Sequence, residues 1–435
     1  MNDTVSVVGA GLAGSEAAWQ LAKRGIDVRL YEMKPECFSP AHTMSGFAEL
    51  VCSNSLKAEY LSNASGLLKA EMRLMDSLIL KAADAARLPA GGALAVDRQV
   101  FSDYVTEALG ALENVKIVRE RVDVLPPSPA VIATGPLTHE KLLDAIRTLP
   151  GFSGLHFFDA EAPIVTKESL DMTKIFAASR YGRGEDDYLN CPMTEDEYNA
   201  FYDALVSAET AEVHDFDKNL VFEGCIAVEI LASRGRQTLA FGPMKPVGLT
   251  DPRTGKMPYA VVQLRRDNMA GSLYNLVGFQ TRLKFAEQKR VFSMIPGLEH
   301  AEFARHGVMH KNTYLNSPEV LGANFQTKRD PLLCFAGQMT GVEGYVESAA
   351  SGLVAAVGLA RRIKGLTEAD FGQYTILGAL SGYVTVPQKD FQPMNANFGL
   401  LPGTERKIRS KKERYEYLSR RSLDALAKKI EEGKV

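Results

Sequence analysis

The chain has 435 residues, of which 24% are charged and 46% hydrophobic, and its formal net charge is -3. This length predicts two or three domains around a large core, and the composition is that of a soluble globular protein. Because the chain begins with polar residues and contains no apolar run of transmembrane length, we expect neither a cleavable signal peptide nor a membrane span.

The five cysteines lie far apart, at Cys37, Cys52, Cys191, Cys225 and Cys334. Their odd number, and the lack of any CxxC pair or Cys/His cluster, argue against a disulfide framework and predict no metal site. A reducing cytoplasmic setting is therefore expected. In that setting each thiol is either a buried packing residue or a group that takes part in chemistry.

The first 32 residues contain a complete dinucleotide-binding pattern. An apolar strand over 5–8, a glycine-rich turn, a helix that ends at Lys23 and a second strand over 27–32 follow one another. The glycines of such a turn permit a sharp bend, close approach of a pyrophosphate and close helix packing, and the acid accepts hydrogen bonds from a ribose diol. The nucleotide-binding residues predicted here are Gly9, Gly11, Gly14 and Glu32.

Cys52 stands directly before a Ser-Asn-Ser cluster, which is typical of a helix N-cap. A helix that began there would favour the thiolate form of Cys52 through its unpaired N–H groups. Taken alone, however, Cys52 is better explained as a buried packing residue.

Further elements extend the nucleotide-binding segment as far as residue 135. We predict a helix over 67–86, an Asp-Arg pair that leads into another helix, strands over 115–118 and 121–125, and an apolar strand over 130–135 that ends in Ala-Thr-Gly. This order is typical of flavoproteins. The cofactor contacts predicted from it are Asp97, Arg98, Thr134 and Gly135. A surface ion pair is the alternative for the first two.

The pattern changes in the middle of the chain, where short strands alternate with glycine-rich loops. Strands are predicted over 221–229, 259–264 and 273–279, with basic and aromatic residues between them. Such a surface is able to stack bases and neutralise phosphates. Half-buried strands with polar outer faces would give the same pattern.

The nucleotide-binding pattern returns near residue 332, with a strand, a glycine turn and a helix of small residues from about 349. The cofactor residues predicted here are Gly337, Gln338, Gly344 and Tyr345. The tyrosine ring either stacks on a flavin or pterin or faces the core. The predicted fold class is α/β: a discontinuous Rossmann-like FAD-binding domain of the glutathione-reductase type (1–154 and 321–435), with an inserted α+β domain rich in antiparallel strands (155–320).

The last 35 residues are basic, with eleven Lys and Arg against six Asp and Glu, whereas the rest of the chain is acidic. A basic tail on an acidic body fits a polyanionic partner. Charge alone favours the simpler interpretation of a solvated surface helix.

Together the motifs resemble one family from end to end, the bacterial folate- and FAD-dependent tRNA (uracil-5-)-methyltransferases. The matching segments include GAGLAGSEAAWQLAKRG at 9–25, FAELVCSNSL at 47–56, PAGGALAVDR at 89–98, YLNCPMT at 188–194, FEGC at 222–225, FGPMKPVGL at 241–249 and GQMTGVEGYVESAASGL at 337–353. The loop at 42–46 departs from the expected pattern, and its role is left open.

The resemblance implies FAD as cofactor, 5,10-methylenetetrahydrofolate as carbon donor, NAD(P)H as reductant, and ribothymidine in the T-arm of tRNA as product, with no membrane partner. The two functional cysteines of the family match Cys225 and Cys52. We expect the Cys225 thiolate to add to C6 of uracil and Cys52 to remove the C5 proton. The opposite assignment stays open.

If tRNA is the partner, the basic tail is expected to contact its phosphates. The tail residues predicted to bind RNA are Lys407, Arg409, Lys411, Lys412 and Arg414. Three alternatives remain at the level of sequence. They are the same chemistry on a ribosomal RNA uridine, a flavin-dependent modification of the tRNA wobble uridine by a related but longer protein, and an RNA-folding factor that merely binds flavin.

Overall fold

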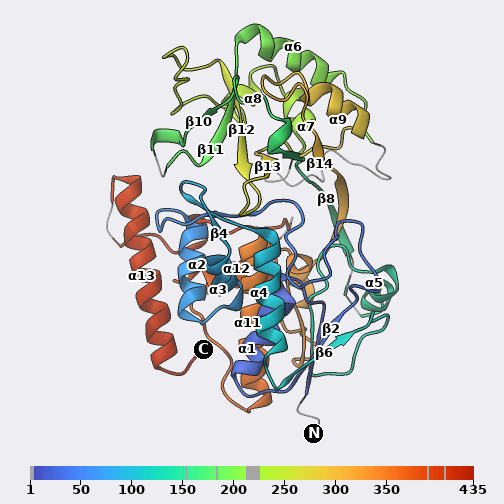
Figure 1. Ribbon diagram of the computed structural model, residues 1–435. Helices are drawn as coiled ribbons and strands as arrows, with labels where there is room; N and C mark the ends of the chain where they lie inside the picture. The colour runs from blue at the N-terminus through green and yellow to red at the C-terminus, as the bar shows by residue number, and fades with distance from the viewer. Residues whose placement is uncertain are drawn as a thin grey trace.

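The computed structural model describes residues 4–149, 151–152, 154–182, 185–211, 226–388, 391–405 and 408–435. Figure 1 shows two parts, a lower one formed by the N-terminal and C-terminal segments and an upper one built from the middle of the sequence. The lower part contains a parallel sheet and the upper part an antiparallel one. No described helix is long and apolar enough to cross a membrane.

The lower part is organised around a five-stranded parallel sheet with the order β16-β7-β1-β2-β6. Its strands are β1 (Val5–Val8), β2 (Val28–Glu32), β6 (Val115–Arg119), β7 (Ala130–Ile132) and β16 (Leu333–Phe335). Most of their apolar side chains are buried, as expected for parallel strands covered on both faces. Four strands come from the first third of the chain, and β16 returns from residue 333. The sheet is therefore assembled from two distant segments.

The described residues 121–125 form no strand, so the prediction of a strand there is wrong. Arg121 and Asp123, which would project from one face of a strand, form an ion pair with an Nε–Oδ1 distance of 2.7 Å. Pro126 and Pro127 follow directly, and neither has an N–H group to donate to a neighbouring strand. The segment therefore joins β6 to β7 as an irregular connection.

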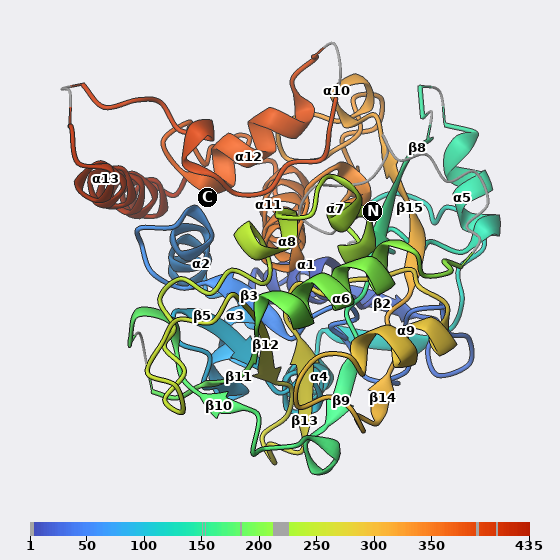
Figure 2. The same ribbon diagram turned by 90° about the horizontal axis from the view of Figure 1, so that it is seen from above.

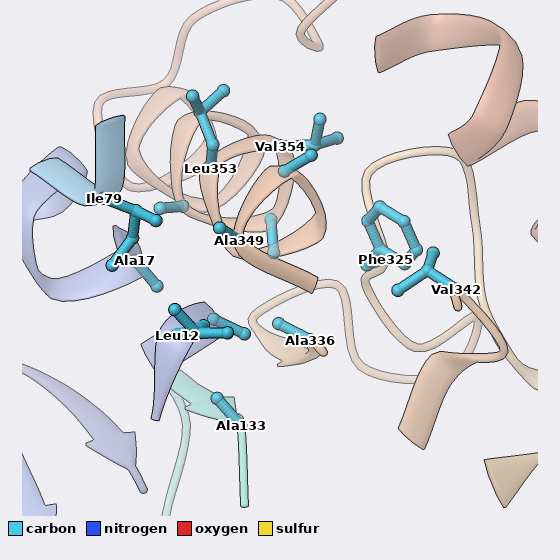
Figure 3. Close-up of a cluster of buried hydrophobic side chains, with 14 of the residues drawn as sticks. Leu12, Ala17, Ile79, Ala133, Phe325, Ala336, Val342, Ala349, Leu353 and Val354 are labelled. Carbon is cyan, nitrogen blue, oxygen red and sulfur yellow. The ribbon is translucent and has the colours of Figure 1, made fainter. Parts of the chain in front are cut away.

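Two helices at the glycine-rich end of the sheet pack directly on each other. They are α1 (Leu12–Lys23) and α11 (Tyr345–Ile363), and Figure 3 shows apolar side chains of both in one buried cluster. A Cβ atom on Gly352 of α11 would lie 2.1 Å from the carbonyl oxygen of Ala13. Close packing of the two helices therefore requires glycine at this position, which explains the small residues of the C-terminal motif.

The single helix predicted over 67–86 is in fact two helices, α2 (Ala64–Leu74) and α3 (Leu78–Ala85). Between them Asp76 has a positive φ of 58°, a conformation that ends a helix. The indole N–H of Trp19 in α1 donates to the Asp76 carbonyl oxygen at 2.8 Å. Contact with α1 thus fixes a break that apolar periodicity does not reveal, since the apolar spacing continues through it.

The upper part contains a six-stranded antiparallel sheet with the order β10-β11-β12-β13-β9-β14. Its strands are β9 (Ile164–Thr166), β10 (Phe176–Ala177), β11 (Tyr188–Met193), β12 (Ala260–Arg266), β13 (Leu273–Leu276) and β14 (Phe303–Arg305). The strands predicted near 259–264 and 273–279 are confirmed, the second in shorter form. All six strands fall inside the predicted insertion, whose boundaries stay a prediction.

The remaining elements connect or cover the two sheets. The helices are α4 (Arg98–Gly110), α5 (Glu140–Arg147), α6 (Glu195–Val206), α8 (Thr238–Phe241), α9 (Phe285–Phe292) and α10 (Ser317–Val320). The strands are β3 (Ser55–Ala58), β4 (Arg87–Leu88) and β5 (Ala93–Val96), which form a small sheet, and the antiparallel pair β8 (Gly154–Ala160) and β15 (Met309–Leu315).

The strand predicted over 221–229 lies mostly outside the described residues, which resume at 226. The described end of the segment is helical instead, because α7 (Val228–Ser233) begins there. Glu229 accepts hydrogen bonds from the Thr281 hydroxyl at 2.9 Å and the Arg282 amide at 3.0 Å, which holds α7 against the following loop. A short apolar run does not distinguish a strand from a buried helix, and here tertiary contacts decide.

The basic C-terminal segment forms α13 (Lys411–Glu431), which lies beside α2 in both views (Figures 1 and 2). Glu71 of α2 is fully buried and accepts hydrogen bonds from the Ser422 hydroxyl of α13 and from the first two amides of α12 (Ile376–Thr385). Burial raises the pKa of Glu71 to about 7. One face of α13 is therefore anchored, while five of its basic residues are exposed: Lys411, Lys412, Arg414, Arg420 and Lys428.

Candidate functional site

A cleft of about 1170 Å³, partly open to solvent, lies at the carboxyl ends of β1, β7 and β16. Ligands of parallel α/β sheets bind at this edge. Many of the predicted cofactor residues line the cleft: Gly9, Gly11, Glu32, Thr134, Gly135, Gly337, Gln338 and Tyr345. The structure thus brings the two distant nucleotide-binding segments to one site.

The three glycines of the first turn have different surroundings. Gly9 has a φ of +94°, and a Cβ atom on Gly14 would lie 1.8 Å from the Gly9 carbonyl oxygen. A Cβ atom on Gly11 would meet no described atom within 4 Å, because this residue faces the cleft. The first and third glycines therefore serve the fold, and Gly11 leaves the N-terminus of α1 open to an anionic ligand.

The Glu32 carboxylate is held at the end of β2 by two backbone amides. Oε2 accepts a hydrogen bond from the Ala10 N–H at 2.9 Å, and Oε1 accepts one from the Lys34 N–H at 3.0 Å. A carboxylate has about four acceptor positions. Glu32 is therefore fixed beside the glycine turn with acceptor positions left, and its contact with a ribose diol stays a prediction.

The loop at 42–46, whose role the sequence leaves open, is fixed beside the same cleft. Glu49 accepts hydrogen bonds from the backbone of Thr43 and Met44 at 2.9 and 3.1 Å, and it lies 3.5 Å from the Lys34 ammonium. His42 also lines the cleft, and burial, helped by Lys34, lowers the pKa of its imidazole. Sequence reasoning missed this group, because its members carry no recognisable spacing.

A second cavity of about 1160 Å³ continues from the cleft. The residues that line both are Val51, Pro136, Leu137, Gln338, Tyr345 and Ser348. The polar residues found only in the second cavity include Cys52, Ser53, Lys57, Glu161, Gln280, Asn312, Glu343 and Asn395. A ligand that fills the cleft therefore reaches the second cavity near Cys52. A second molecule can bind beside it in that cavity.

Cys52 lies in a loop rather than before a helix, so the predicted helix N-cap is wrong. The chain enters β3 at Ser55, and the polar side chains after Cys52 bind the upper sheet instead. Arg265 of β12 donates to the Ser53 hydroxyl at 2.8 Å and to the Asn54 side-chain oxygen at 2.9 Å. These side chains, which the sequence pattern assigns to helix capping, hold the Cys52 loop between the two sheets.

Tyr345, the first residue of α11, reaches the same loop with its hydroxyl group. The phenolic oxygen lies 2.7 Å from the Cys52 backbone nitrogen, 3.2 Å from that of Ser53 and 2.9 Å from the Cys52 sulfur. Its ring stands at the junction of the two cavities. Gly344, predicted with it, has a φ of +120° and lines the second cavity, so glycine permits the bend that directs Tyr345 inward.

Asp97 and Arg98 are not among the described residues that line the cleft, and their partners lie elsewhere. Asp97 caps α4 and accepts a hydrogen bond from the Met269 amide at 2.7 Å. Arg98 donates to the Leu50 carbonyl oxygen and pairs with Asp267 at 3.2 Å. The Asp-Arg pair therefore fastens the Cys52 loop to the upper sheet, and its contact with the cofactor stays a prediction.

The chain matches the model of one protein family, described as glucose inhibited division protein A, over residues 4–367. Curated relatives are named methylenetetrahydrofolate--tRNA-(uracil-5-)-methyltransferase TrmFO. The protein from Lactiplantibacillus plantarum is 58% identical over 97% of this chain and 96% of its own length. Those from Lactobacillus delbrueckii subsp. bulgaricus and Bacillus licheniformis are 59% and 58% identical over 98% of both chains. This chain belongs to the TrmFO family.

Two solved structures of Aquifex aeolicus GidA share the fold of this TrmFO family member. Their TM-scores are 0.69 and 0.68, with 17% and 16% sequence identity, and they cover 99% of this chain and 78% and 76% of the GidA chains. This likeness confirms the predicted α/β fold class. At such low identity it says nothing about the residues of the site.

Two of the residues predicted for the TrmFO site, Cys225 and Lys407, lie outside the described residues.

The remaining cysteines agree with the packing interpretation in part. Cys191 and Cys334 are fully buried, and burial raises the pKa of both thiols, that of Cys334 to about 12. Cys37 is half-buried. Within the described residues, no group of three or more His, Cys, Asp and Glu side chains is placed to hold a metal ion.

The other predicted RNA-binding residues lie at the exposed start of α13 or just before it: Arg409, Lys411, Lys412 and Arg414. Lys411 and Arg414 lie over the Tyr415 ring, at 5.5 and 5.4 Å from its centroid. Tyr415 in turn stacks on Phe398 with a centroid distance of 4.2 Å. Lys411 and Arg414 therefore contact a pair of stacked aromatic rings at the surface.

Proposed function

We propose that this protein transfers a one-carbon unit from 5,10-methylenetetrahydrofolate to C5 of the T-loop uridine of tRNA, with FAD and NAD(P)H supplying the reduction. This chain is 58% to 59% identical, over nearly its full length, to proteins named for this activity, and this similarity supports the reaction. The observation that carries it in this chain is the pair of joined cavities, one lined by the dinucleotide motif and the other by Cys52.

The cleft fits FAD at its nucleotide end. The N-terminus of α1 opens onto the cleft at Gly11 and suits a pyrophosphate, and Glu32 suits a ribose diol. Gln338 lines both the cleft and the second cavity, and therefore marks the place where the two join. When bound, FAD supplies the reducing equivalents of the reaction. The residues of this chain bind it and orient it.

Thiol chemistry accounts for the rest of the reaction. Uracil C5 is a poor nucleophile, and addition of a thiolate at C6 makes C5 able to attack an electrophilic methylene. We assign this addition to Cys225, on the strength of the FEGC segment at 222–225, and removal of the C5 proton to Cys52. The bond between C6 and sulfur breaks again when the methylene carbon is reduced to the methyl group, which releases the Cys225 thiolate. The opposite assignment requires the same two thiols. In either role Cys52 acts from the wall of the second cavity.

The test is formation of ribothymidine in a T-arm RNA by the flavin-loaded protein with methylenetetrahydrofolate and NADPH. We expect carbon label from the folate in the product and none from labelled S-adenosylmethionine. A ribosomal RNA fragment and an anticodon stem-loop serve as competing substrates. Methylation of either in preference to the T-arm, or label from S-adenosylmethionine, would contradict the proposal. Flavin binding without any product would favour the RNA-folding alternative.

We further predict that the start of α13 binds RNA phosphates. Changing Lys411, Lys412 and Arg414 to glutamine should weaken binding of the T-arm RNA and reduce the slope of log affinity against log salt by about 2 to 3, because each phosphate contact releases a counterion. A filter-binding salt titration measures this. The matched control changes Arg420, Lys428 and Lys434, three other basic residues of the same tail, to glutamine. Equal losses in both variants would leave only a general charge effect.

A further inference from the structure

The hydrogen-bonding capacity of the Tyr345 hydroxyl determines which way its proton points. A phenolic oxygen carries one hydrogen and two lone pairs. Backbone N–H groups are always donors, and those of Cys52 and Ser53 approach this oxygen at 2.7 and 3.2 Å. Both lone pairs are therefore engaged. The phenolic hydrogen has the Cys52 sulfur, 2.9 Å from the oxygen, as its acceptor.

The reverse direction, with the thiol donating, is disfavoured by the same count. The thiol and the two backbone N–H groups would then all donate to the phenolic oxygen, which has only two lone pairs. The phenolic hydrogen would also lose the sulfur as its acceptor. Burial raises the pKa of Tyr345 well above its ordinary value, so the phenol keeps its proton at neutral pH. A hydrogen bond donated to sulfur is stronger when sulfur is negatively charged, and it therefore favours the thiolate.

The surroundings hold this geometry from three directions. Tyr345 is fixed at the start of α11, and the Cys52 loop is bound by Arg98 from α4 and by Arg265 from β12. Arg98 also contributes charge. Burial acts to lower the pKa of its guanidinium, but the negative charge of its ion-pair partner Asp267 is the largest opposing influence, and the pKa stays above its ordinary value. A cation near the sulfur favours the thiolate in the same way as the phenol.

We propose that Tyr345 is a positioning residue for Cys52, which donates its phenolic hydrogen bond to the sulfur and so keeps a fraction of the thiol ionised at neutral pH. The inference deepens the proposed methyl transfer and rests on it for its purpose. It applies whether Cys52 adds to C6 or removes the C5 proton, since both roles require the thiolate. The role is distinct from stacking on the flavin, which uses the ring rather than the hydroxyl.

The test measures alkylation of Cys52 by iodoacetamide in the full-length, flavin-loaded protein from pH 6 to 10, with peptide mass spectrometry to identify the site. Tyr345→Phe removes only the donor. We expect the midpoint of the Cys52 profile to rise by at least one pH unit, which is about a tenfold loss of thiolate below both midpoints. Incorporation of 3-fluorotyrosine at position 345 makes the phenol a stronger donor at nearly the same size, and should lower the midpoint.

Two controls separate this role from general disruption. Tyr202 is partly buried, lines neither cavity and donates its hydroxyl to the Ala232 carbonyl oxygen, so Tyr202→Phe should leave the Cys52 profile unchanged. The half-buried Cys37 is an internal reference in every sample. Coincident Cys52 profiles in the wild-type and Tyr345→Phe proteins would overturn the inference, as would an equal shift at Cys37. If Tyr345→Phe does not fold, an unshifted fluorotyrosine profile overturns it. Neither RNA nor folate is present, so failure of the methylation assay is a separate result.

Discussion

Replacing Cys52 with alanine is expected to lower ribothymidine formation by about 10³-fold, the typical contribution of a group that transfers a proton in the transition state. Cys52 lies on the wall of the second cavity, and its loop is fixed by Arg98, Arg265 and Tyr345. The substitution removes the sulfur and leaves in place these contacts, which are made with the backbone of the loop and with the side chains of Ser53 and Asn54. The rate is measured with T-arm RNA under single-turnover conditions, so that slow product release does not hide the chemical step.

The matched control for this substitution is Cys37→Ala. Cys37 is also half-buried, but it is not among the described residues that line either cavity, and we expect its replacement to leave the rate within about twofold of wild type. Flavin content, read from the absorbance spectrum, should be equal in both variants. A Cys52→Ala protein that retains its flavin and methylates at the wild-type rate would remove Cys52 from the chemistry.

The second large effect is expected at Gly14. A Cβ atom there would lie 1.8 Å from the Gly9 carbonyl oxygen, and because this neighbour is backbone it has no side-chain freedom with which to move away. Gly14→Ala should therefore destabilise the flavin-free protein by about 3 kcal/mol, at the upper end of the usual cost of overpacking. Urea unfolding followed by circular dichroism measures this loss.

Gly11→Ala is the matched variant in the same turn, and it should behave in the opposite way. Gly11 has a φ of -72°, which any residue adopts, and a Cβ atom there enters the cleft without meeting a described atom within 4 Å. We expect stability of the flavin-free protein to change by less than about 0.5 kcal/mol and flavin affinity to fall at least tenfold. Equal destabilisation by both variants would show that the distinction between turn packing and ligand approach is false.

Local patterns allowed the nucleotide-binding elements to be predicted well, because their signals lie within a few residues of one another. The glycine turn, α1 and the strands β1, β2 and β7 follow the pattern directly. Predictions failed where a distant contact overrides local preference. The helix over 67–86 is broken where Trp19 holds the Asp76 carbonyl oxygen, and the Ser-Asn-Ser cluster binds Arg265 rather than helix amides.

The candidate site shows the same division. Its cleft residues could be predicted, since each glycine or acid has a fixed place in the dinucleotide pattern. The contact between Cys52 and Tyr345 could not, because 293 positions separate them and no periodicity links them. The same holds for Arg98 and Asp267, which are 169 positions apart. The Asp-Arg motif was recognised, but its role depends on the position of the upper sheet.

The pairing of β16 with β7 also sets an order of events during synthesis. Val131 of β7 pairs with Cys334, so about 200 residues must be translated before this edge of the sheet is covered. At typical rates of protein synthesis that interval is roughly 10 to 40 s. Throughout it, the apolar strand Ala130–Ile132 presents unpaired N–H and C=O groups, a surface prone to association with other chains. The newly made chain therefore passes through a stage at which this edge of the sheet is open, and completion of β16 ends that stage.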